Sequence, residues 1–197
     1  MTGNLLMAST RRMGPQDSAT SNALLDATEA VLRNEGYGAA TSRRIAAEAG
    51  VKQQLVYYYF RTMDELLLAT FQRRTTRALA KLAEDVAAER PIQALWQSLS
   101  SMVDGKLVFE FVALANHHEG IRAEVARYVA ESRRLESEAI GRQFKEQGID
   151  AGPVSAKAAA FVMYAVTLVL RREAATGITE GHEDVLALMD WALARTV

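Results

Sequence analysis

The feature that most restricts the fold of this 197-residue chain is a pair of short helical segments with only residues 50–52 between them. The first begins at Thr41 or Ser42, both good helix N-caps, and ends near Ala49. The second covers residues 53–59. Because the connection is short, the two helices must cross sharply. This arrangement is typical of helix-turn-helix DNA-binding motifs, and it also occurs as a plain corner of a helical core.

Steric requirements at the crossing favour the DNA-binding motif. The first helix needs a small inner residue, the turn needs a residue that tolerates positive φ, and the second helix needs a branched apolar residue facing back. Ala46, Gly50 and Val56 supply these residue types at spacings of 4 and 6, and glycine adopts positive φ without strain. The pattern therefore predicts a helix-turn-helix.

The outer face of the second helix is polar and aromatic if Val56 and Phe60 face inward. Glutamine amides pair with base edges, preferring adenine, while lysine and tyrosine side chains contact phosphate oxygens. Helix N-termini also bind phosphate. The DNA-contacting residues predicted from this pattern are Thr41, Ser42, Arg43, Lys52, Gln53, Gln54, Tyr57 and Tyr58. Tyr57 also fits a core position, and Arg44 fits a solvated surface.

The rest of the chain favours helix as well. It contains 3 prolines and is 49% hydrophobic, and it is rich in Ala, Leu, Glu and Arg, which are good helix formers. No segment shows the two-residue period of a strand. The predicted fold class is all-α, with helices over residues 18–35, 41–49, 53–59, 63–89, 91–104, 106–118, 119–147, 156–175 and 183–194.

The predicted organisation has three regions: a flexible arm over 1–16, a helix-turn-helix domain over 17–62 and a helical domain over 63–197. Terminal segments of small polar residues are usually mobile, although Arg11 and Arg12 are also suited to reach a phosphate or a minor groove.

Composition and charge narrow the function classes. Cysteine is absent, which removes thiolate metal sites and cysteine catalysis and fits a reducing cytoplasm. The most apolar stretch, 158–170, is shorter than the roughly 20 residues that span a bilayer, and no secretory signal pattern is present. Net charge is −1, but residues 41–61 are locally basic, which suits a polyanion partner. We expect a cytoplasmic protein that does not bind membranes.

The stretch TSRRIAAEAGVKQQLVYYYFRTMDELLLATF, together with LLDATEAVLRNEGYGAA before it, resembles the N-terminal domain of the tetracycline-repressor (TetR) family of bacterial transcription regulators. The glycines, the Ile-Ala pair, the tyrosine cluster, Phe60 and DELL all match in register. The resemblance implies an all-helical homodimer. Three N-terminal helices would bind DNA, a divergent body would bind a small molecule, and the last two helices of each chain would form a four-helix dimer bundle.

Residue by residue, the resemblance assigns DNA contacts to Thr41, Ser42, Arg43, Gln53, Gln54, Tyr57, Tyr58 and Tyr59. Two positions depart from the family pattern. Leu55 stands where the family usually has threonine, and Met63 stands where it usually has lysine; both family residues normally touch phosphate. Their replacement either weakens binding or shifts the phosphate contacts to Lys52, Arg61 and the arm.

The apolar helix over 158–170 must bury both faces, within the chain or against a second chain. A dimer that reads a palindrome favours the second case. The predicted interface residues are Phe161, Leu168, Leu186, Met189 and Leu193.

Aromatic and methionine residues in the middle of the chain are usually plain core, yet a helical bundle also encloses apolar pockets with a few polar groups. On the family resemblance we expect a mostly apolar effector of unknown identity. Its candidate contacts are Trp96, Met102, Phe109, His118, Tyr128 and Tyr164. No metal or cofactor is expected, because the adjacent pair His117 and His118 points about 100° apart on a helix and lacks a third ligand.

The leading hypothesis is a ligand-responsive transcriptional regulator, a repressor that binds a pseudo-palindromic DNA operator as a homodimer. The alternative is a helical small-molecule-binding protein or enzyme with a vestigial DNA-binding head. No nucleophile–base pair, HExxH motif or glycine-rich phosphate loop supports an enzyme. A membrane-surface protein ranks last, since the helices lack a lysine- and arginine-rich polar face opposite an apolar one.

Overall fold

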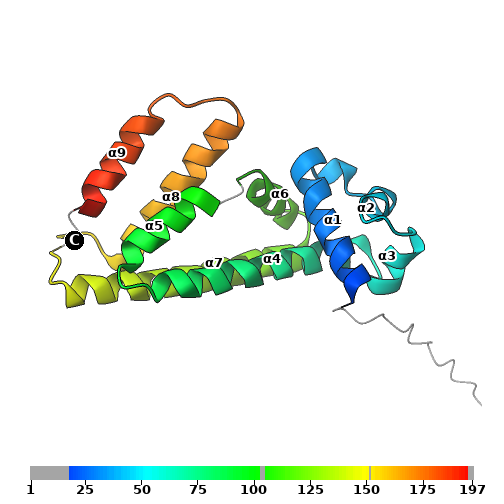
Figure 1. Ribbon diagram of the computed structural model, residues 1–197, viewed down its shortest axis with the longest axis horizontal. Helices are drawn as coiled ribbons and strands as arrows, with labels where there is room; N and C mark the ends of the chain where they lie inside the picture. Colours follow the sequence, from blue (N-terminus) through cyan, green and yellow to red (C-terminus); the bar gives the residue numbers. More distant parts are fainter. Residues whose placement is uncertain (1–17, 103–104, 151, 195–197) are drawn as a thin grey trace, which may run out of the picture. The chain divides into compact units, whose positions relative to one another are not determined.

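The computed structural model describes residues 18–102, 105–150 and 152–194 (Figure 1). Every regular element in these ranges is a helix, so the predicted all-α fold class is confirmed. The predicted arm over 1–16 lies outside the described residues. The elements are α1 (Ala19–Glu35), the 3₁₀ helix η1 (Tyr37–Ala39), α2 (Ser42–Glu48), α3 (Gln54–Tyr59), α4 (Met63–Val86), α5 (Pro91–Met102), α6 (Gly105–Ala115), α7 (Glu119–Glu146), α8 (Ala156–Ala175) and α9 (His182–Leu193).

The chain divides into two compact units, one up to Thr70 and one from Phe71 on. We call them the N-terminal unit and the C-terminal unit, and α4 contributes residues to both. The predicted domain boundary between residues 62 and 63 falls at the start of the same helix and stays a prediction. Among the described helices, none combines the length and the apolar character needed to cross a bilayer.

Side-chain caps set the helix starts in the N-terminal unit. At the start of α1, Ser18 Oγ accepts a hydrogen bond from the Ser21 backbone N–H at 3.1 Å. At the start of α2, Thr41 Oγ1 accepts one from the Arg44 backbone N–H at 3.2 Å. Both bonds satisfy N–H groups that a helix start leaves without an intrahelical partner. The predicted N-terminal ends of these helices are therefore correct to within a residue.

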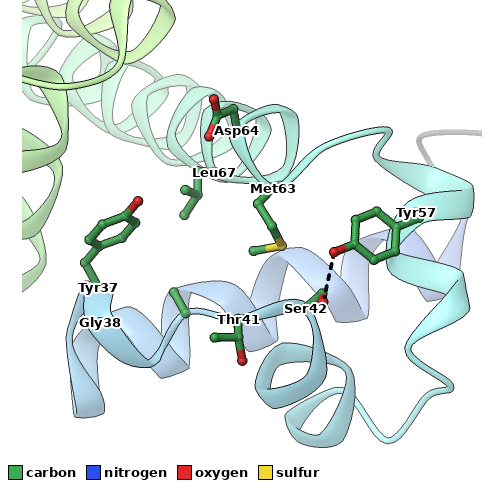
Figure 2. Close-up of a pocket in the computed structure, with 9 residues that line it drawn as sticks. Tyr37, Gly38, Thr41, Ser42, Tyr57, Met63, Asp64 and Leu67 are labelled. Carbon is green, nitrogen blue, oxygen red and sulfur yellow. Dashed lines mark hydrogen bonds between the residues drawn. The ribbon is translucent and has the colours of Figure 1, made fainter.

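The core of the N-terminal unit is aliphatic. α1 packs against α2, and α2 packs against α3. α1, α2, α3 and the start of α4 each contribute fully buried side chains, among them Leu24, Leu32, Ile45, Val56 and Leu66. Each such side chain contributes about 1.5–3 kcal/mol through removal of apolar surface from water. This packing fixes the polar N-terminus of α2 beside the first residue of α4 (Figure 2).

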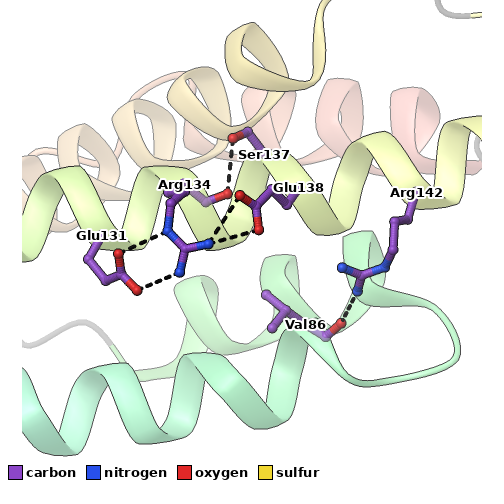
Figure 3. Close-up of polar contacts among 6 residues, drawn as sticks. All are labelled: Val86, Glu131, Arg134, Ser137, Glu138 and Arg142. Carbon is purple, nitrogen blue, oxygen red and sulfur yellow. Dashed lines mark hydrogen bonds and ion pairs between the residues drawn. The ribbon is translucent and has the colours of Figure 1, made fainter.

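Hydrogen bonds cap both ends of α4. At its start, Thr62 Oγ1 accepts the Glu65 backbone N–H at 3.1 Å, while Glu65 accepts the Arg61 N–H at 2.9 Å. These two bonds form a capping box whose return bond is moved one residue towards the N-terminus. At its end, the Arg142 guanidinium donates to the Val86 carbonyl at 2.9 Å (Figure 3). That bond satisfies a carbonyl at the helix end, and α4 ends three residues before the predicted position.

The C-terminal unit is organised around α7, which packs against α5, α6 and α8. Its core joins side chains of α5, α7, α8 and α9, namely Ile92, Leu95, Trp96, Ile140, Ala160, Met163 and Met189. On the solvent side of α7, Arg134 bridges Glu131 at 2.6 Å and Glu138 at 2.9 Å (Figure 3). These exposed pairs lie within one turn on either side and support the helix locally.

Candidate nucleic-acid interface

The turn between α2 and α3 has the geometry that the sequence predicts. Gly50 has φ of 66°, the left-handed value for which glycine was expected. Ala46 is 1% exposed and Val56 is 0% exposed, so the small residue and the branched residue both face the crossing. The two helices approach closely because Ala46 is small, Gly50 adopts a positive φ and Val56 is apolar. The helix-turn-helix is thus confirmed as a structural motif.

Arg44 fixes the orientation of α2 against α1. Its guanidinium contacts Glu35 Oε1 at 2.6 Å and Glu48 Oε2 at 2.7 Å. The hydrogen bonds that Arg44 donates to Glu35 and then to Glu48 raise the pKa of Arg44 above its ordinary value. The sequence suggested a solvated surface residue here. The spacing of four residues to Glu48 was a visible signal, but the contact with Glu35 at the end of α1 was not.

The predicted DNA-contacting residues lie along the start of α2 and along α3. Exposed side chains are those of Thr41, Arg43, Lys52, Gln53, Gln54, Tyr57 and Tyr58, while Tyr59 is half-buried and Ser42 is buried. Tyr57 and Tyr58 expose 42% and 48% of their surface, so neither is a core residue. Tyr59 meets Tyr58 edge-on with ring centroids 5.0 Å apart. The structure therefore gathers eight of these nine residues on accessible or partly accessible positions.

The buried Ser42 hydroxyl accepts hydrogen bonds from two side chains on the other side of the turn. Gln53 Nε2 donates to Ser42 Oγ at 2.9 Å, and the Tyr57 hydroxyl donates to the same oxygen at 3.1 Å. Figure 2 shows the second of these bonds. The two bonds connect the first residue of α2 with both ends of the face that α3 presents. No sequence pattern predicts them, since the partners are 11 and 15 residues apart.

A pocket of about 400 Å³ adjoins this network within the N-terminal unit. Met63 and Asp64 contribute to it from the start of α4 (Figure 2). Met63 stands at the position where the family usually has a lysine. A thioether and a carboxylate here offer no positive charge to a phosphate. The complete lining is Tyr37, Gly38, Ala40, Thr41, Ser42, Tyr57, Met63, Asp64 and Leu67.

The predicted effector contacts lie in different environments of the C-terminal unit. Trp96 is buried in the core, while Phe109, Tyr128 and Tyr164 are half-buried. His118 precedes α7 as its N-cap residue, but its side chain does not cap the helix. The side chain of Met102 lies outside the described part of the chain. These assignments stay predictions, and within the described residues no cluster of three metal-ligating side chains is present.

The carboxyl of Glu136 on α7 is buried near the half-buried Tyr128 and Tyr164. Glu136 is 7% exposed, and burial raises its pKa to about 7, although Arg133 Nε at 3.7 Å acts in the opposite direction. Burial also raises the pKa of Tyr128 and of Tyr164. One turn before Glu136, Ser132 Oγ is inaccessible and has no hydrogen bond of ordinary geometry. It lies near enough to the Tyr128 hydroxyl to lower the pKa of that group.

The predicted dimer residues fall into two groups. Phe161 and Leu186 are exposed, by 61% and 40%, whereas Met189 is 9% exposed and packs with Leu193 in the chain's own core. Leu168 is half-buried. We define the α8/α9 apolar surface as the exposed large apolar side chains of these two helices: Phe161, Val162, Val169, Leu186, Leu188 and Trp191.

Comparison with known proteins agrees with the motif. Residues 24–70 match the family described as bacterial regulatory proteins, tetR family. An uncharacterised helix-turn-helix transcriptional regulator in the dhlA 5′ region of Xanthobacter autotrophicus is 25% identical over 184 residues, covering 88% of this chain and 91% of its own length.

Two solved structures share the fold. A candidate transcriptional regulator of Streptomyces coelicolor A3(2) has a TM-score of 0.60 at 26% identity, covering 80% of this chain and 88% of its own. A TetR transcription regulator of Haloarcula marismortui has a TM-score of 0.69 at 21% identity, covering 80% and 86%. The motif and the helical fold define a helix-turn-helix transcriptional regulator. Residues 24–70 carry the domain of the tetR family of bacterial regulatory proteins, which confirms the resemblance inferred from the sequence of this region.

Proposed function

We propose that the protein is a non-enzymatic cytoplasmic repressor, which binds a pseudo-palindromic operator as a homodimer and leaves it when a mostly apolar small molecule binds the C-terminal unit. The observation that carries the proposal is the accessible face of α3. Gln53 and Gln54 stand at its start and Tyr57 and Tyr58 follow, all exposed beside the polar N-terminus of α2. The amides of the two glutamines suit hydrogen bonds to base edges. The phenols of the two tyrosines suit contacts with phosphates.

The homodimer follows from the reading geometry and from the α8/α9 apolar surface. One α3 can contact one half-site, and a two-fold protein reads two half-sites one helical turn apart. A second copy would also cover Phe161, Leu188 and Trp191, which expose 61%, 59% and 56% of their surface to water. Isolated exposed apolar residues are ordinary, but several large ones on two adjoining helices favour a protein partner.

The effector response is supported by the polar group inside the C-terminal unit. Ser132 Oγ is buried on α7 without a hydrogen-bond partner among the described residues, and Glu136 is buried one turn later, where burial raises its pKa. A buried polar group that lacks partners costs free energy. A ligand that is apolar over most of its surface and places a hydrogen-bond donor here would remove that cost.

The first experiment is selection of bound duplexes from a random DNA pool at two salt concentrations. We expect enrichment of a two-fold symmetric site, with weaker binding at the higher salt because phosphate contacts release counterions. Gln53→Ala should relax the selected sequence, whereas Tyr58→Phe should weaken all duplexes alike. The enriched site then serves as the probe for small molecules that release it.

The alternative, a small-molecule-binding protein or enzyme with a vestigial DNA-binding head, draws support from Met63 and Asp64 at the start of α4. Near-equal binding at both salt concentrations, or no binding once co-purified small molecules have been removed, would establish that alternative and overturn the repressor proposal.

A further inference from the structure

The hydroxyl of Ser42 holds the two ends of the predicted reading face in place before any DNA is present. Gln53 Nε2 and the Tyr57 hydroxyl both donate to Ser42 Oγ, at 2.9 and 3.1 Å. A serine oxygen accepts two hydrogen bonds, so these donors occupy its acceptor capacity. Ser42 itself is 7% exposed. Its side chain is therefore engaged inside the protein, and its direct contact with DNA stays a prediction.

The bond to Ser42 has a consequence for what Gln53 offers to solvent. An unrestrained glutamine side chain moves among several rotamers and so presents its amide to a base edge in several ways. With Nε2 donating to Ser42 Oγ, the amide is held at one position beside α2, and Oε1 and the second N–H remain available. Adenine presents an N6 donor beside an N7 acceptor in the major groove. A fixed amide can match that pair, whereas a rotating one also pairs with other bases.

We propose that Ser42 is a specificity-determining positioning residue, which sets the base preference of Gln53 by fixing the orientation of its amide without touching a base itself. The inference rests on the proposed function, because it requires Gln53 to face the major groove. Side chains held by neighbouring hydrogen bonds recognise more selectively than free ones, since less rotational freedom is lost on binding.

Helix-start hydroxyls outside the predicted DNA-contacting residues provide matched controls. Ser18 Oγ accepts the Ser21 backbone N–H at the start of α1, and Thr62 Oγ1 accepts the Glu65 backbone N–H at the start of α4. Ser18→Ala and Thr62→Ala therefore each remove a hydroxyl from a helix terminus while leaving the bond between Ser42 and Gln53 in place.

The test is duplex selection with the native chain, the variants Ser42→Ala, Ser42→Thr and Gln53→Ala, and the Ser42→Ala/Gln53→Ala double variant. Ser18→Ala and Thr62→Ala are the two controls, and every variant is checked for its thermal unfolding midpoint. Ser42→Ala should lower the base preference at one base pair by roughly 2- to 10-fold, the effect of releasing one flexible side chain. Gln53→Ala should relax the same base pair, and the double variant no further. Ser42→Thr retains the hydroxyl and should retain the preference. The two controls should leave the selected sequence unchanged.

Two outcomes would overturn the inference while leaving the proposed function standing. One is a native base preference in Ser42→Ala when Gln53→Ala has lost it. The other is an equal loss of affinity for all duplexes in Ser42→Ala that adds to the effect of Gln53→Ala, which would make Ser42 a phosphate contact. Failure of the native chain to enrich any duplex would instead count against the proposed function itself.

Discussion

The two units of this chain place polar and apolar side chains in opposite ways. In the described part of the N-terminal unit, the buried polar residues are small hydroxyls, namely Ser21, Thr28, Ser42 and Thr70. In the C-terminal unit, α7 alone buries Glu124, Ser132, Glu136 and Gln143, while α8 and α9 expose large apolar side chains. The N-terminal unit is thus organised like an ordinary small helical domain, whereas the C-terminal unit combines its apolar core with buried charged groups on α7 and exposed apolar side chains on α8 and α9.

That difference indicates where the chain's binding functions reside. Among its described residues the N-terminal unit buries small hydroxyls, of which Ser21 Oγ has no hydrogen-bond partner, and it exposes hydroxyls, amides and a guanidinium. The C-terminal unit leaves two requirements open: an apolar surface that water does not favour, and the buried carboxyl of Glu136, whose charged form burial disfavours. A second copy of the chain would meet the first requirement and an effector the second. Substitutions in the N-terminal unit and in the C-terminal unit therefore test this difference between them.

The largest effect is expected on the α8/α9 apolar surface. Leu188 is 59% exposed, and in a symmetric dimer its substitution alters the interface twice. Leu188→Glu should weaken dimerisation by at least about 100-fold, because each buried leucine contributes roughly 1.5–3 kcal/mol. Sedimentation velocity would show a monomer, and operator binding would fall with it.

Val129→Glu is the matched control for this change. Val129 is an exposed valine on α7, 40% accessible and outside the α8/α9 apolar surface, so the same change of charge should leave the sedimentation coefficient unaltered. An unchanged dimer in Leu188→Glu, or dissociation by both variants alike, would show that these helices do not form the interface.

The next largest effect concerns the two buried glutamates of α7, whose pKa values shift in opposite directions. Burial raises the pKa of Glu136 from 4.5 to about 7. The folded chain then binds more protons than the unfolded chain between those values, so stability falls as pH rises through them. Glu136→Gln should raise the free energy of unfolding by on the order of 2 kcal/mol at pH 8. The gain should disappear below about pH 4.5, where the carboxyl is protonated in both states.

Glu124 supplies the contrast on the same helix. The hydrogen bond from Arg127 lowers the pKa of Glu124 against the effect of burial, and the bond from Thr75 at 2.5 Å lowers it further. This carboxylate contributes stability above its ordinary pKa and loses it as pH falls. Glu124→Gln should therefore destabilise the protein at pH 8. Urea unfolding at fixed protein concentration measures both variants, and the same sign of change in both would refute the distinction.

How much of this the sequence predicts depends on the range of the interactions. Helix starts at Ser18, Thr41 and Ser155 follow from local caps, and the turn at Gly50 from local sterics, so all were predictable. The polar interior of α7 was not. The sequence predicts a helix over 119–147, but no local pattern in it places Glu124, Glu136 or Gln143 inside, and all three are buried. Glu124 and Gln143 are held partly by groups of other helices, Thr75 Oγ1 on α4 and the Ile92 backbone N–H on α5, which lie 49 and 51 residues away in the sequence.

The same limit applies to the DNA-reading face. The residue types of α3 and their spacing predicted which side chains are accessible, because helical geometry repeats within a few residues. The contacts of Ser42 with Gln53 and of Arg44 with Glu35 span the turn and the end of α1. No periodicity records such pairs, since they depend on how the helices cross.

A smaller effect is expected at the turn of the helix-turn-helix. Gly50 has positive φ, and a methyl group added to its Cα would meet no atom within 4 Å, so backbone strain alone opposes a side chain there. Gly50→Ala should reduce the free energy of unfolding by about 1–2 kcal/mol. Gly38→Ala is the matched control, because Gly38 also has open space but an ordinary φ. Equal thermal midpoints for the two variants would contradict the strain argument.

The smallest effect is a gain of affinity in the N-terminal unit. Met63 lines the pocket beside Thr41, Ser42 and Tyr57, and a lysine there would add the positive charge that the chain lacks at this position. Met63→Lys should tighten operator binding by roughly 3- to 10-fold at moderate salt and steepen the salt dependence by about one counterion. Asn34→Lys, an exposed change of the same charge away from the pocket, separates a local contact from net charge. If both variants bind alike, the start of α4 does not face a phosphate. The N-terminal unit then reads DNA without the contact that its family usually makes there, and α2 and α3 carry the binding themselves.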